Sequence, residues 1–155
     1  MPDAMATLKQ YAATLKNPAW LCFIWFGMSA GISLLETPVK FTAPTITREA
    51  ALDVGRVVFA ALNKAEFVAL ILLLILVRIS GRAHRLIVAC LALALIQIVQ
   101  AAWLLPELSA RTQQIIAGIE PPPSAAHGTF AALQLLKLAL LLYLGFRSLK
   151  GVTTK

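Results

Sequence analysis

Charged residues are scarce in this chain. Only 14% of its 155 residues are charged and 59% are hydrophobic, whereas about 25% charged residues is usual for a soluble domain. The long apolar runs that take their place indicate an integral membrane protein. The length is sufficient for one membrane domain over residues 1–155 and leaves no room for a separate soluble domain.

The sequence patterns of common catalytic sites are also missing. There is no nucleophile triad, no G-x-x-x-x-G-K-[ST] loop, no C-x-x-C pair and no H-E-x-x-H. Cys22 and Cys90 lie within apolar runs, which is typical of buried thiols rather than of a disulfide. We therefore expect no catalytic or metal-binding residues and no enzyme activity, and the sequence names no cofactor. The net charge of +7 comes without interleaved basic and aromatic residues, so nucleic acid is not an expected partner.

Four apolar segments are long enough to cross a bilayer, because about 20 helical residues span ~30 Å of hydrocarbon. They cover residues 18–39, 55–79, 86–105 and 127–147. Pro38 and Pro44 are expected to end the first helix, and Pro106 to interrupt the third before an amphipathic surface helix. The helix of the second span should begin at the interface near Thr47. The sequence thus predicts an all-α integral membrane four-helix bundle.

The distribution of charge predicts the orientation of the bundle. The N-terminal segment, the turn at residues 78–85 and the C-terminal tail contain one acid, Asp3, and many cations. These cations are Lys9, Lys16, Arg78, Arg82, Arg85, Arg147, Lys150 and Lys155. The two other connections have mixed charge. By the positive-inside rule both termini are expected in the cytoplasm, in agreement with an even number of spans. The expected location is a cell membrane of the bacterial inner-membrane type.

Polar residues inside the predicted spans are the candidates for a site. Counting from the cytoplasmic arginines at ~1.5 Å per residue places Glu66, Gln97 and Lys137 at similar depths of ~15–18 Å. Buried charges persist by pairing, so Glu66 and Lys137 are predicted to interact. Asn63 and Gln134 complete this candidate intramembrane polar site.

Other candidates lie closer to the outer face or serve packing. Lys64 is ~200° from Glu66 around its helix, so we expect it to point outward or to contact Glu36. His127 is expected as a polar residue at the start of the fourth span. Gly27 and Gly31 form a G-x-x-x-G pair, which is expected to pack against another helix of the same chain.

Two stretches resemble a known family. Residues 100–106, Q-A-A-W-L-L-P, followed by Arg111 and Gly118, resemble the exit of the third helix in the transmembrane protein 205-like family. His127-Gly128 and the later Gln134-Leu135 are similar to that family's His-Gly…Asn-Leu pattern, with glutamine in place of asparagine. Residues 55–59, G-R-V-V-F, are similar to its entry into the second helix. The resemblance implies a four-helix membrane protein and no defined activity. The loop between the third and fourth helices is shorter here than in animal members.

Two functions remain open from the sequence. The first is a small multi-pass membrane protein that handles or transports a small solute or ion, with Glu66 and Lys137 central. The second is a structural or partner-binding membrane subunit. A water-accessible cavity reaching the Glu66 layer would favour the first, and a dry, fully paired core the second. The expected partners are the lipid bilayer and either a second copy of the chain or another membrane protein.

Overall fold

The chain is all-α, as predicted, and contains four helical stretches that are long and apolar enough to cross a membrane. A computed structural model describes residues 4–81 and 83–150. The four stretches are Ala19–Lys40, Arg48–Ile79, Leu86–Ile116 and Ala126–Leu149. Asp3, Arg82 and Lys155, which contribute to the predicted orientation, lie outside the described residues.

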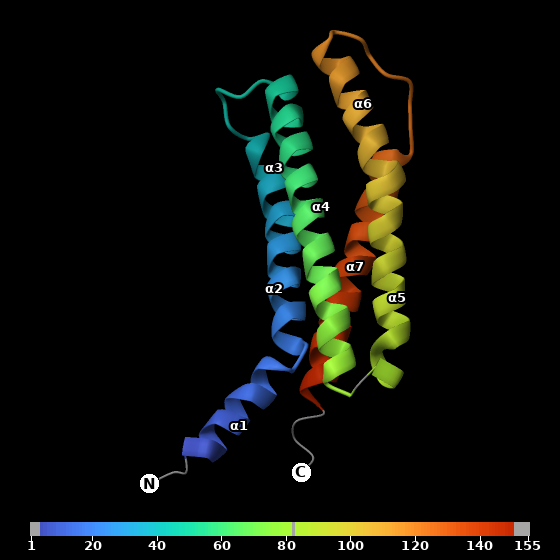
Figure 1. Ribbon diagram of the computed structural model, residues 1–155. Helices are drawn as coiled ribbons and strands as arrows, with labels where there is room; N and C mark the ends of the chain where they lie inside the picture. Colours follow the sequence, from blue (N-terminus) through green and yellow to red (C-terminus); the bar gives the residue numbers. More distant parts are fainter. Residues whose placement is uncertain (1–3, 82, 151–155) are drawn as a thin grey trace.

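The helices form an up-and-down bundle (Figure 1). In chain order the elements are α1 (Ala4–Leu15), α2 (Ala19–Ala30), the π turn η1 (Gly31–Glu36), α3 (Thr37–Lys40), α4 (Arg48–Ile79), α5 (Ala83–Val99), the π turn η2 (Gln100–Leu104), α6 (Leu105–Ile116) and α7 (Ala126–Leu149). α2 and α5 each pack against both α4 and α7. α4 and α7 therefore face each other across the bundle, and both run from the end with α3 and α6 toward the end with the chain termini (Figure 1).

Pro38 and Pro106 do not end their helices, and this part of the sequence prediction was wrong, whereas Pro44 lies in the loop after Lys40. The Thr37 N–H bonds the carbonyl of Ile32 just before Pro38, and the Leu105 N–H bonds the carbonyl of Gln100 just before Pro106. Each bond spans five residues. A π turn is wider than an α turn, so it lets the helix continue past a proline that would clash with an ordinary turn.

The predicted boundaries change accordingly. The first span extends to Lys40, and the predicted surface helix after Pro106 is instead a continuation of the third span as far as Ile116. The helix of the second span begins at Arg48, where the Thr47 side chain caps it by accepting a hydrogen bond from the Ala50 N–H at 3.3 Å. The expected start near Thr47 is thus confirmed.

The tightest apolar core lies in the half of the bundle near the termini. Trp25, Leu73, Leu93 and Leu141 are fully buried there, together with the free thiols Cys22 and Cys90. Large apolar side chains on the outside, such as Val68 and Leu95, are more than half exposed, as expected where a helix faces lipid rather than water. The opposite half is more polar, and the candidate site lies where the two halves meet.

Candidate functional site

α4 and α7 carry matching ladders of side chains, each on one face of its helix. On α4 the ladder is Arg56, Phe59, Asn63 and Glu66, and on α7 it is His127, Phe130, Gln134 and Lys137. In both, the spacing is three, four and three residues, which keeps every member on one helix face. Residues 59–62 and 130–133 have the same sequence, F-A-A-L. Each ladder thus descends from a basic residue through a phenylalanine and an amide to a buried charge.

Glu66 and Lys137 form a buried ion pair in the middle of the bundle. Lys137 Nζ lies 2.7 Å from Glu66 Oε2, and the two side chains are 0% and 3% exposed. Glu66 Oε1 accepts hydrogen bonds from the Trp25 indole at 3.2 Å and from the Ser29 hydroxyl at 2.7 Å. Both carboxylate oxygens therefore have donors, which offsets the cost of burying the charge.

Gln97 connects this ion pair to the next layer. The ammonium of Lys137 donates to Gln97 Oε1 at 3.0 Å, and Gln97 Nε2 donates to the main-chain oxygen of Asn63 at 3.3 Å. Because Gln97 belongs to α5 and Trp25 to α2, all four spans contribute to one network. The sequence predicted that Glu66, Gln97 and Lys137 lie in one layer, and in the structure Lys137 contacts the other two. Their role as a functional site stays a prediction.

Gln134 forms a second, uncharged cluster one turn above Lys137. Its Nε2 donates to Ser33 Oγ in η1 at 3.1 Å, and its Oε1 accepts from Gln100 Nε2 in η2 at 3.2 Å. Gln100 Nε2 also lies 3.5 Å from the carbonyl oxygen of Phe130. Gln134 therefore connects α7 to both π turns, because its side chain is hydrogen-bonded to one residue of η1 and one residue of η2.

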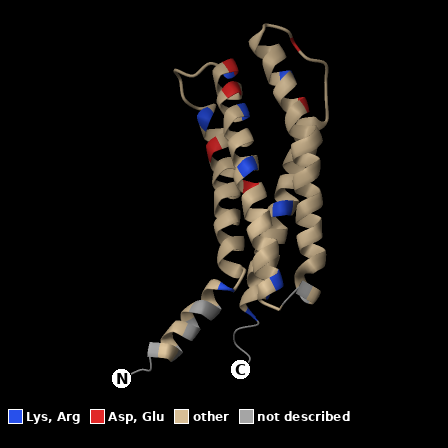
Figure 2. Cartoon of the chain, in the orientation of Figure 1, with Lys and Arg blue, Asp and Glu red and all other residues tan. Residues whose placement is uncertain are grey.

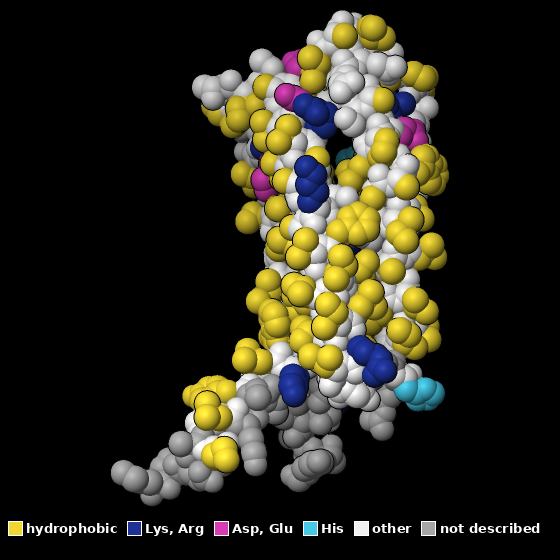
Figure 3. All heavy atoms as spheres, viewed as in Figure 1, with side chains coloured by type: hydrophobic (Ala, Val, Ile, Leu, Met, Phe, Trp, Pro, Cys, Tyr) yellow, Lys and Arg dark blue, Asp and Glu magenta, His cyan; other side chains and the backbone are white. Residues whose placement is uncertain are grey.

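A pocket of about 600 Å³ lies above these clusters. Its walls come from all four spans, and Asn63 and Gln134 form its polar floor. Figure 3 shows the hollow in the upper part of the molecule, between α4 and α6. The rings of Phe59 and Phe130 meet edge to face at 5.4 Å between centroids, one turn above that floor. Glu66 and Lys137 do not line the pocket and lie one helix turn below it.

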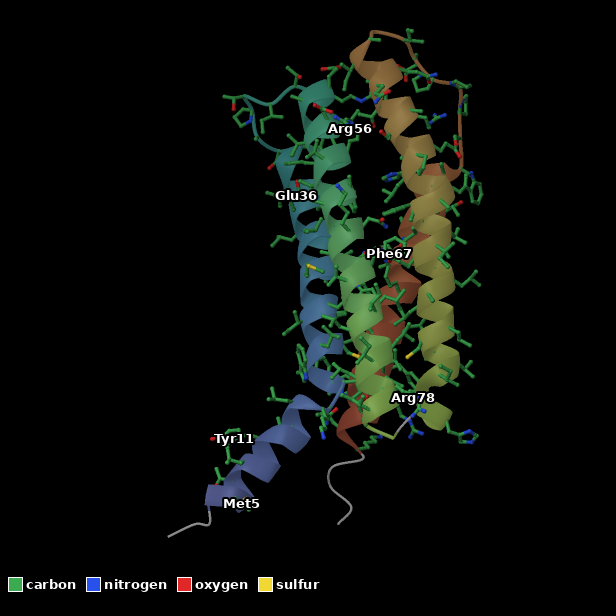
Figure 4. All side chains as sticks on the ribbon, in the orientation of Figure 1. Met5, Tyr11, Glu36, Arg56, Phe67 and Arg78 are labelled. Atoms are coloured by element: carbon green, nitrogen blue, oxygen red, sulfur yellow. The ribbon has the colours of Figure 1, made fainter. Side chains whose placement is uncertain are left out.

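The outer-face candidates are near the pocket. Glu36 pairs with Lys40 at 3.4 Å. Lys64 and His127 are exposed and line the pocket, and no contact joins Lys64 to Glu36 within residues 4–81 and 83–150. Figure 4 shows Glu36 and Arg56 in this upper half and Arg78 at the opposite end of α4. Lys64 does not pair with Glu36 as one of the two expectations held, and its exposed side chain borders the pocket.

Gly27 and Gly31 do not pack as predicted. A Cβ atom added to either glycine would have no heavy atom of the described chain within 4 Å. Their spacing places both on one helix face, but that face is open in a single chain. The close approach occurs instead at Gly145, where an added Cβ would lie 2.8 Å from the Phe23 ring.

Sequence reasoning missed four members of these clusters: Trp25, Ser29, Ser33 and Gln100. The shared F-A-A-L segments and the matched spacing were readable from the sequence, but they do not reveal that α4 and α7 face each other. Within the part of the chain that the structure describes, no three metal-ligand side chains come together.

Comparison with known proteins adds no assignment. No family model, no curated protein and no solved structure matches the sequence. The pocket and the network beneath it are therefore the features that bear on function.

Proposed function

We propose that this chain is a multi-pass membrane protein that binds and moves a small solute through the pocket between α4 and α7. The observation that carries the proposal is a roomy pocket whose floor residue Asn63 is connected through Gln97 to a buried ion pair. Ligand pockets usually measure about 300–1,000 Å³ and combine apolar walls with a few placed polar groups. This pocket has both properties.

The duplicated architecture supports the proposal. Each half of the chain has a span with a π turn and a proline, followed by a span with the ladder. Pro38 and Pro106 occupy corresponding positions in the two halves. Transporters often consist of such repeats, with interrupted helices in matching positions and the solute bound between the repeats near the midplane.

The hydrogen-bond chain gives the pocket a route to the ion pair. A solute that contacts Asn63 at the floor would shift the carbonyl that Gln97 bonds, and Gln97 also holds the Lys137 ammonium. A buried charge that loses a partner must find another. Occupancy of the pocket can therefore alter the packing of the lower half, which a solute-driven conformational change requires.

A structural or partner-binding subunit is the second candidate. Glu66 and Lys137 are buried and paired with each other, which is the property that favours this class. The open face at Gly27 and Gly31 leaves room for a second copy or another membrane protein. The resemblance to the transmembrane protein 205-like family fits both candidates, because it implies no defined activity.

Thiol labelling separates the two candidates. Ala131→Cys and Asn63→Cys would each place a thiol in the pocket, and the native thiols Cys22 and Cys90 are fully buried. A charged, membrane-impermeant methanethiosulfonate reagent should modify both new thiols in intact cells. Leu95→Cys, on the lipid-facing side, is the control and should react slowly. Failure of both pocket thiols to react would overturn the solute proposal and favour the structural subunit.

We also propose that both termini face the cytoplasm of a cell with a bacterial-type inner membrane. Among the described residues, the acids lie in the upper half and near the middle, whereas the end near the termini carries lysine and arginine (Figure 2). A reporter that is active only outside the cytoplasm should give a signal when it is fused after residue 120. The same reporter should be silent after residue 155. The opposite pattern would show that the bundle has the inverse orientation in the membrane.

A further inference from the structure

Basic side chains gather on the pocket wall. Lys40, Arg56, Lys64 and His127 line the pocket, and none of the described aspartates or glutamates does. We propose that the solute is an amphiphilic organic anion, with a carboxylate or phosphate group on an apolar body. This inference rests on the proposed function and narrows it to a substrate class.

Lys40 is built into the wall rather than left in solvent. Its side chain is only 9% exposed, and a Cβ added to Gly55 would lie 2.6 Å from its Nζ. The absence of a side chain at position 55 therefore makes room for the ammonium group against α4. The same Nζ lies 5.7 Å from the centre of the Phe41 ring, a second lining residue.

The pairing of these cations leaves positive charge available to a solute. Arg56 is matched by Asp53 at 2.7 Å, and Lys40 has a long contact of 3.4 Å with Glu36. For Lys64 the described part of the chain provides no ion-pair partner. A carboxylate or phosphate would give Lys64 an ion-pair partner and would compete with Glu36 for Lys40. Charge-assisted hydrogen bonds of this kind are stronger than hydrogen bonds between neutral groups.

The rest of the wall suits an apolar body. Besides the cations, the lining includes Phe59, Phe130, Leu105 and Leu135. Leu34 and Leu135 line the pocket and are also 55% and 56% exposed. An apolar chain could therefore lie along the wall and extend toward the surrounding lipid, while its charged end stays with the lysines.

Octanoate, octanol and octyltrimethylammonium are the probes for this inference, since they share one chain and differ in charge. Purified Ala131→Cys protein in phosphatidylcholine nanodiscs is labelled with an uncharged maleimide in the presence of each compound. Octanoate should slow labelling at a concentration at least about tenfold lower than octanol does, as expected from one or two charge-assisted contacts. The cation should protect least.

Substitutions test which of the pocket's basic side chains bind the anion. In the Ala131→Cys background, the pair Lys40→Gln/Lys64→Gln should raise the octanoate Kd about tenfold. Lys64→Glu, at an exposed position that tolerates change, should reverse the order of octanoate and octyltrimethylammonium. Arg48→Gln removes an outer charge that does not line the pocket and should leave the Kd within about twofold.

The outcomes distinguish the source of the anion and the failure of each proposal. Protection by added phosphatidylglycerol that depends on the same lysines would identify a lipid headgroup, and protection by octanoate alone would identify a free acid. Either supports the inference. Equal protection by all three compounds, or no effect of the lysine variants, would overturn the anion class while labelling still supports a solute pocket. A thiol that no reagent reaches would overturn the proposed function itself.

Discussion

Lys137→Met is expected to be the most damaging single substitution, because it leaves the Glu66 carboxylate buried without a cation. Removing one partner of a buried ion pair typically costs ~3–5 kcal/mol. Lys137 is 0% exposed and donates to both Glu66 and Gln97, so water cannot replace it without opening the bundle. The measurement is the free energy of unfolding in detergent.

Lys64→Met is the matched control for that measurement. Lys64 is exposed and has no ion-pair partner among the described residues, so its loss should change stability by about 0.5 kcal/mol or less. Equal effects of Lys64→Met and Lys137→Met would show that the ion pair contributes nothing beyond the loss of one lysine.

The double variant Glu66→Leu/Lys137→Met should cost less than the sum of its two single changes. Two well-packed apolar residues can replace a buried pair with little loss, and contacting residues show coupling energies of about 0.5–3 kcal/mol. If the double variant folds but octanoate no longer protects Ala131→Cys, the ion pair acts on the pocket. If protection is unchanged, the pair serves structure alone.

The fold followed from the sequence because the bilayer limits the alternatives. Each span must satisfy its own backbone hydrogen bonds, so apolar length alone predicted four helices. The ends of these helices were less predictable. From the sequence, Pro38 was expected to end one helix and Pro106 to interrupt another. In the structure the wider turns η1 and η2 accommodate both prolines. Whether a π turn forms depends on contacts such as those of Gln134 with Ser33 and Gln100, which local sequence does not reveal.

The sequence predicted how deep the polar residues of the site lie along their helices, but not which helices they face. Helix rise is nearly constant, so counting residues put Glu66, Gln97 and Lys137 in one layer. It could not say that α4 and α7 face each other across the bundle, or that a tryptophan of α2 reaches the carboxylate. The same limit explains Gly27 and Gly31. Their spacing defines a face, but only the packing of the other helices decides whether anything lies against it.

Trp25→Ala should cause the second large loss of stability, and this loss should have two separable parts, one from packing and one from the hydrogen bond to Glu66. The side chain is fully buried and its indole donates to Glu66 Oε1 at 3.2 Å. Truncating a buried tryptophan costs about 3–5 kcal/mol through lost contacts and the cavity left behind. Trp25→Phe keeps most of the volume and removes the donor, so it should cost about 1.5–3 kcal/mol, the usual range for a hydrogen bond to a charged group.

Trp103→Ala is the matched control, because that indole also donates to a glutamate, Glu107, at 3.0 Å, while its side chain is 57% exposed. Its loss should change the free energy of unfolding by less than about 1 kcal/mol. An unchanged stability for Trp25→Phe would mean that Ser29 alone satisfies Glu66 Oε1, and Trp25 would then belong to the apolar core and not to the charged network. A loss as large for Trp25→Phe as for Trp25→Ala would place nearly all of its contribution in the hydrogen bond to the Glu66 carboxylate.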